Sequence, residues 1–144
     1  MKHYFSWLTI ILPSLKNVNL NILIFRVMLS LELIVVHGLK KVGIGVEQAE
    51  LVPNPYHFAV GLNNFLAISA NLFFPALVIF GFLTRLAILP ILAVTLSGYF
   101  VVHWNDSLLV KDVPFMYSLS YLFLLFVGPG KYSIDNYINK RKWV

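Results

Sequence analysis

The 144-residue sequence contains no cysteine and very few charged residues. Without a thiol, the chain itself can supply no disulfide, no thiolate nucleophile, and no cysteine ligand for an iron–sulfur cluster or a zinc ion. Charged residues make up 12% of the chain and apolar residues 59%, against roughly 25% and about 45–50% in soluble domains. Together with a mean hydropathy of +0.80, this composition indicates a membrane protein, and the length suits one domain.

The few charges are mostly positive, giving a net charge of +5. The basic residues stand at the ends of apolar runs and form no continuous stripe, so we predict no nucleic-acid partner. Lysines and arginines beside apolar runs are typical of the cytoplasmic face of a membrane.

Four long apolar runs predict four membrane-spanning helices, at about residues 20–39, 63–83, 85–104 and 112–128. The runs are continuous rather than alternating, which favours helices over barrel strands. We therefore predict an all-α, four-helix transmembrane bundle that forms a single domain over residues 1–144. The shorter apolar segment Tyr4–Pro13 is expected to be a short helix lying in the membrane interface.

The distribution of basic residues predicts the orientation of the bundle. Three basic residues, Lys40, Lys41 and Lys111, fall on one side of a four-span arrangement, and seven fall on the other: Lys2, Lys16, Arg85, Lys131, Lys140, Arg141 and Lys142. This bias predicts that both termini are cytoplasmic.

Three polar residues, Arg26, Glu32 and Asn71, fall inside the apolar runs. A charge at membrane depth costs about 2.5–3.5 kcal/mol, so we expect Arg26 to be paired inside the bundle, with Glu32 or Asn71. At about 100° per residue, Arg26, Ser30 and His37 lie nearly in line, and Glu32 is about 120° away. These residues either hold the helices together or form a functional pocket, and both interpretations stay open.

Three of the four histidines, His37, His57 and His103, fall on the predicted outer side. His37 and His103 are candidate ligands for a metal or a haem, although no metal site is assigned. Alternatively, histidine and tyrosine can donate hydrogen bonds to the carbonyl oxygens of a quinone, which we expect ahead of a haem. The third interpretation is that imidazoles suit the interface, with an apolar body and a polar tip.

With antiparallel packing of successive helices around the bundle, the first and third helices can both line one cavity that opens outward. His37 and His103 would face each other across it, and its walls would include Ser30, Asn71 and Tyr99, which precedes His103 by one turn. Mostly apolar walls with a few convergent polar groups suit a ligand with an apolar body and a polar head.

Four pieces of the sequence, in order, resemble the DoxX family of small four-helix bacterial membrane proteins. The resemblance covers about residues 20–137 and has one piece in each helix. The pieces are Arg26 and Ser30 with His37-Gly38-Leu39-Lys40-Lys41, then Gly81-Phe82-Leu83-Thr84-Arg85-Leu86-Ala87, then His103 near the end of the third helix, and last Gly128-Pro129-Gly130-Lys131-Tyr132-Ser133-Ile134-Asp135.

The resemblance implies a location in the bacterial cytoplasmic membrane and an association with sulfur-oxidising quinone reductases or other membrane oxidoreductases. The chain departs from the family pattern at Ser30, where a glycine is usual, and at Asn71, where a glutamate is expected. An asparagine can hydrogen-bond but cannot carry a proton by titration.

From the sequence we predict a redox-associated membrane protein that binds a quinone or a lipid-like ligand between its helices. A non-enzymatic scaffold or assembly factor and a small-molecule transporter are the competing hypotheses. The predicted partners are the lipid bilayer, a membrane oxidoreductase and a second copy of the chain. The sequence assigns no catalytic residue and leaves open whether the protein is an enzyme.

Overall fold

The computed structural model describes residues 17–141, and this part of the chain is all-helical, with no strand. Four helical stretches are long and apolar enough to cross a membrane: Val18–Lys41, Val60–Phe80, Thr84–Val102 and Leu108–Val127. The predicted all-α fold with four spans is therefore confirmed. The segment Tyr4–Pro13, for which an interfacial helix was predicted, lies outside the described residues.

Two of the spans contain a π-helical segment. The first consists of α2 (Val18–Glu32), the π-helix η2 (Leu33–Gly38) and α3 (Leu39–Lys41). The third consists of α6 (Thr84–Ser97) and the π-helix η3 (Gly98–Val102). Short π-helical insertions are rare and frequently occur at functional sites.

The second span is broken in the middle, into α4 (Val60–Asn71) and α5 (Phe73–Phe80). The break follows from Pro75, which has no amide hydrogen and whose ring crowds the carbonyl of Asn71 four residues earlier. Gly38 of η2 packs into this break, where a Cβ would overlap the side chain of Leu72. The break therefore lets the first and second spans approach each other closely.

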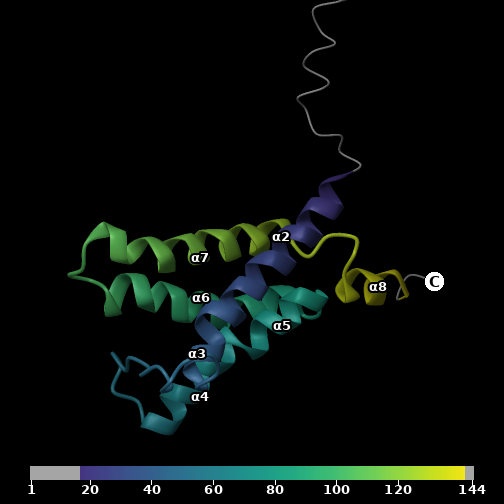
Figure 1. Ribbon diagram of the computed structural model, residues 1–144. Coiled ribbons are helices and arrows are strands. Elements are labelled where there is room, and N and C mark those ends of the chain that lie inside the picture. Colours follow the sequence, from purple (N-terminus) through teal and green to yellow (C-terminus); the bar gives the residue numbers. More distant parts are fainter. Residues whose placement is uncertain (1–16, 142–144) are drawn as a thin grey trace, which may run out of the picture.

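The fourth span, α7 (Leu108–Val127), is followed by the short helix α8 (Ile134–Arg141). Figure 1 shows α6 and α7 running side by side, with α2 crossing them and α5 on the other side of α6. The helix α8 lies beyond the end of α5, at the end of the molecule where α2 begins. α7 starts at Leu108, four residues before the predicted position, so Lys111 and Asp112 lie inside the helix near its start.

The exterior is far more apolar than that of a soluble protein, although the core also contains apolar residues such as Val78, Ile88 and Leu124. Large apolar side chains point outward, with Phe126 73% and Met28 64% exposed. The buried set includes many polar residues: Arg26, Ser30, Asn63, Asn71, Thr84, Thr95, Ser118 and Ser133. A lipid-facing exterior explains this arrangement, since hydrocarbon solvates apolar side chains and leaves polar groups to pair inside the bundle.

Candidate functional site

Arg26 is buried at the α8 end of the bundle, with 1% of its surface exposed. Its guanidinium donates hydrogen bonds to the carbonyl oxygens of Val78, at 3.3 Å, and of Tyr132. Within the described chain, its Nε has no partner. The prediction that Arg26 is paired inside the protein is confirmed, but the predicted partners, Glu32 and Asn71, are wrong. Two backbone carbonyls take their place, that of Val78 in the last turn of α5 and that of Tyr132 in the loop before α8.

Two stretches that are distant in the sequence form one interlocked unit beside Arg26. The carboxylate of Asp135 accepts hydrogen bonds from the amides of Leu83 and Thr84, at 2.7 and 2.9 Å, and from the Thr84 hydroxyl, at 2.8 Å. In return, the Asp135 amide donates to the Gly81 carbonyl at 2.9 Å. Asp135 thus caps the N-terminus of α6. These hydrogen bonds connect the start of α8 to the start of α6.

Asn71 and Ser30 also make internal hydrogen bonds. The Asn71 amide donates to the Ala67 carbonyl of its own helix at 2.6 Å. Ser30 is fully buried and accepts a hydrogen bond from the Tyr121 hydroxyl of α7 at 3.2 Å. The Ser30–Tyr121 bond joins the first span to the fourth, as interhelical bonds between polar side chains do in membrane proteins.

A second set of polar side chains lies farther along the contact between α2 and α7. The rings of His37 and Tyr117 meet edge to face, with centroids 5.3 Å apart. Glu32 interacts electrostatically with both of these side chains. Among the described residues, neither the Glu32 carboxylate, the Tyr117 hydroxyl nor the ring nitrogens of His37 have a hydrogen-bond partner. We call Ser30, Glu32, His37, Tyr117 and Tyr121 the α2–α7 polar face.

The π-helix explains why Glu32 and His37 are both near Tyr117. On an ideal α-helix, residues five apart point in clearly different directions. In η2 the backbone bonds link residues five apart, so the directions of Glu32 and His37 differ less than they would on an α-helix. Sequence reasoning missed this feature, and it also missed Tyr117 and Tyr121. Because Tyr117 and Tyr121 are four residues apart, the sequence already indicated that both lie on one face of the fourth helix.

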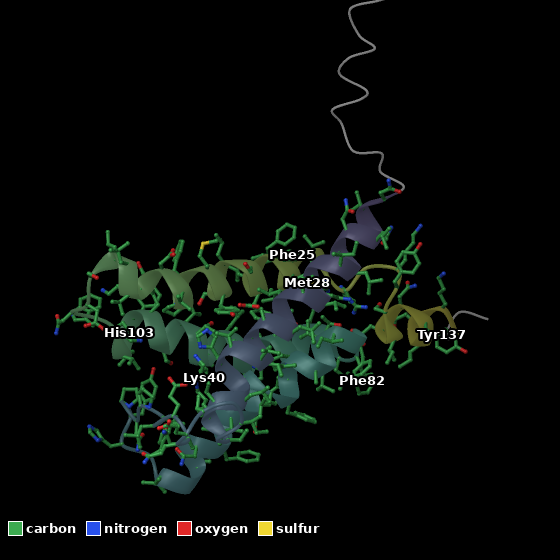
Figure 2. The ribbon with its side chains drawn as sticks, viewed as in Figure 1. Phe25, Met28, Lys40, Phe82, His103 and Tyr137 are labelled. Carbon is green, nitrogen blue, oxygen red and sulfur yellow. The ribbon has the colours of Figure 1, made fainter. Side chains whose placement is uncertain are left out.

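Tyr99 and His103 lie elsewhere. The Tyr99 ring packs against Phe115 at 5.6 Å and borders an apolar groove of about 310 Å³ between α6 and α7. Nδ1 of His103 lies 2.7 Å from a carboxylate oxygen of Asp106 in the loop that follows. Figure 2 shows His103 near the tip of the α6–α7 hairpin.

The seven candidates predicted from the sequence therefore separate into distinct places. Ser30 and His37 contact Tyr121 and Tyr117 of α7, Glu32 is exposed on the same span, and the other four lie elsewhere. His37 contacts Tyr117 and His103 contacts Asp106, and the cavity predicted between the two histidines stays a prediction. In residues 17–141 there is no group of three or more histidine, aspartate or glutamate side chains that could hold a metal ion.

Comparison with known proteins decides the family. The sequence model of the DoxX family matches residues 21–104, more than half of the chain. The chain belongs to the DoxX family. The match includes the first three spans and ends before the Gly128–Asp135 segment on which part of the resemblance rested.

Two curated relatives of this DoxX-family chain are bacterial. Inner membrane protein YqjF of Escherichia coli (strain K12) is 41% identical over 70 residues, which are 46% of this chain and 53% of YqjF. An uncharacterized protein of Haemophilus influenzae is 31% identical over 93 residues, 61% of this chain and 62% of the relative. The chain thus spans between about half and six-tenths of the length of these relatives. No solved structure matches.

Proposed function

We propose that this DoxX-family chain is a bacterial inner-membrane protein that binds a quinone, or a lipid-like ligand with a similar polar head, at the α2–α7 polar face. The proposal rests on one observation: within membrane-spanning helices, the rings of His37 and Tyr117 meet at 5.3 Å, and neither the ring nitrogens nor the hydroxyl has a hydrogen-bond partner in the described chain. Glu32, exposed on the same span as His37, has no hydrogen-bond partner there either. Polar groups at this depth normally pair, because an unsatisfied group in hydrocarbon is costly. A ligand that enters from the bilayer can supply the missing partners.

The three side chains offer the chemistry that a quinone head group needs. A quinone carries two carbonyl oxygens, and both the Tyr117 hydroxyl and a protonated nitrogen of His37 can donate to such an acceptor. The Glu32 carboxylate can accept a hydrogen bond from a quinol hydroxyl. Around them, exposed apolar side chains such as Met28 and Val35 can contact the apolar body of the ligand.

The neighbouring contacts hold the donors in place. Phe25 packs edge to face on Phe123 at 5.9 Å, and Tyr121 bonds Ser30, so α2 and α7 are joined on one side of the His37–Tyr117 pair. A preorganised donor pair loses little conformational entropy on binding. A ligand-binding role of this kind supports the further proposal that the protein works beside a membrane oxidoreductase that uses the quinone.

The test is crosslinking in detergent or nanodiscs with a photoreactive quinone, followed by mapping of the labelled peptides. We expect labels on residues of α2 and α7 close to His37, and His37→Ala and Tyr117→Phe should each reduce labelling about fivefold, the effect of losing one hydrogen bond of about 1 kcal/mol. The matched controls are His57→Ala, in the loop before α4, and Tyr132→Phe, whose ring is exposed outside the spans. Labelling that is unchanged in both variants would exclude this site and leave the scaffold hypothesis.

We also propose that both termini are cytoplasmic, so that the end of α2 near His37 faces the periplasm. The support is the bias of lysine and arginine toward the other side of the membrane. Reporter fusions after Val144 and in the turn at Thr84 should read cytoplasmic, whereas a fusion at Asn54 should read periplasmic. A periplasmic signal from the Val144 fusion would reverse the proposed orientation.

A further inference from the structure

A groove of about 520 Å³ lies at the end of the bundle that carries α8. Its walls are the start of α6 with the turn before it (residues 82–86), the loop at residues 129–130, and one face of α8. Asp135 holds these walls together through its bonds to Leu83 and Thr84. The groove is therefore built by the same contacts that connect α8 to the bundle, and it is separate from the α2–α7 polar face.

An unpaired cation lines this groove. Arg85 is exposed, and within residues 17–141 it forms no hydrogen bond or ion pair. Its guanidinium lies over the end of α7, since a Cβ built on Gly128 would be 3.5 Å from Nη2. The side-chain amide of Asn139 also lines the groove without a hydrogen-bond partner in the described chain. The groove thus presents one positive charge and one amide that are free to bind.

The acidic group in the groove does not oppose an anion strongly. Asp135 is the one acidic residue among the described lining residues, and its carboxylate already accepts three hydrogen bonds. It also interacts electrostatically with the buried guanidinium of Arg26, which offsets its charge. Asp135 occupies the amides of Leu83 and Thr84. The side chains of Arg85 and Asn139 are therefore the polar groups offered to a ligand.

The position of the groove selects the ligand. The third span begins at Thr84 and the fourth ends at Val127, so the groove lies where the spans leave the membrane. α8 exposes Tyr137 and Ile138 beside the basic Lys140, and Figure 2 shows Tyr137 at this end of the molecule. A short helix with an apolar side and basic residues is typical of a segment lying in the head-group region.

We infer that this groove binds the head group of an anionic phospholipid of the surrounding bilayer. Arg85 and Asn139 hydrogen-bond the phosphate, because guanidinium groups bind phosphate oxygens through charge-assisted bonds. Leu86 and Ile138, which line the same groove, contact the start of the acyl chains. Bound lipid thereby ties α8 to the start of α6.

The experiment measures binding of phosphatidylglycerol to the detergent-purified protein by native mass spectrometry, with phosphatidylcholine and inorganic phosphate as separate arms. We expect phosphatidylglycerol to bind more tightly than phosphatidylcholine, and Arg85→Gln to weaken it about fivefold, the contribution of one arginine near an anionic surface. Arg85→Lys should retain part of the preference, and Asn139→Ala should reduce it less than Arg85→Gln. The matched control is Lys40→Gln. Lys40 is an exposed cation at the end of the first span, on the opposite side of the membrane from Arg85.

Two results would overturn the inference. Equal binding of the two phospholipids would show that the head-group charge is not recognised. Displacement of phosphatidylglycerol by millimolar inorganic phosphate would show a site for a free anion instead of a lipid. Because Arg85 makes no bond within the described chain, the Arg85→Gln protein is expected to keep its thermal unfolding midpoint, so a change in lipid binding reports on the groove.

Discussion

Gly81→Ala is expected to remove most of the folded protein. Gly81 has φ +67°, in the left-handed region, where a residue with a Cβ is strained by roughly 1–2 kcal/mol. The Cβ would also overlap the guanidinium of Arg26 and crowd the side chain of Ser133. Arg26 would have to leave its bonds to Val78 and Tyr132, each worth about 1.5–3 kcal/mol for a charged donor.

Together, these effects should destabilise the folded state by at least about 3 kcal/mol. The measurement is the fraction of monodisperse protein after gel filtration in mild detergent, together with the thermal unfolding midpoint. Gly61→Ala is the matched control, because Gly61 is helical and a Cβ there meets nothing within 4 Å. A Gly81→Ala protein as stable as Gly61→Ala would contradict the packing of Arg26 against this turn.

Asp135→Ala is the second substitution with a large expected effect. It removes the acceptor of three hydrogen bonds and leaves the amides of Leu83 and Thr84 without their partner. It also removes the negative charge that offsets the buried Arg26. We expect a loss of about 3 kcal/mol, measured as a lower unfolding midpoint, together with faster proteolysis of α8.

Asp135→Asn should recover part of this loss, since an amide oxygen still accepts a hydrogen bond but more weakly than a carboxylate. Asp112→Ala provides the comparison for a lost aspartate, because Asp112 is exposed at the opposite end of the bundle and has no bonded partner in the described chain. If Asp135→Ala and Asp112→Ala shift the midpoint equally, Asp135 does not connect α8 to the start of α6.

The sequence by itself determined the class of protein, the number of spans and the family. A run of about 20 apolar residues has one low-energy structure in hydrocarbon, since a helix satisfies all of its backbone groups internally. This constraint acts locally, so composition and length were sufficient to place all four spans. The prediction that Arg26 is paired could be made for the same reason, because an isolated charge at that depth is costly.

Only the tertiary structure decided which polar groups meet. Arg26 bonds backbone carbonyls, and a carbonyl carries no sequence signal because every residue has one. Asp135 caps a helix that begins 51 residues earlier, a pairing that depends on how the chain returns to this end of the bundle. Tyr117 lies near His37 and Glu32 because the fourth span packs on the first.

The π-helix shows the same limit within a single span. Facing positions were predicted with 100° per residue, which holds for an α-helix. Between Leu33 and Gly38 the backbone is wider, and Gly38 packs where Pro75 breaks the second span at Leu72. The direction of His37 therefore depends on contacts between two spans, and the local sequence does not contain that information.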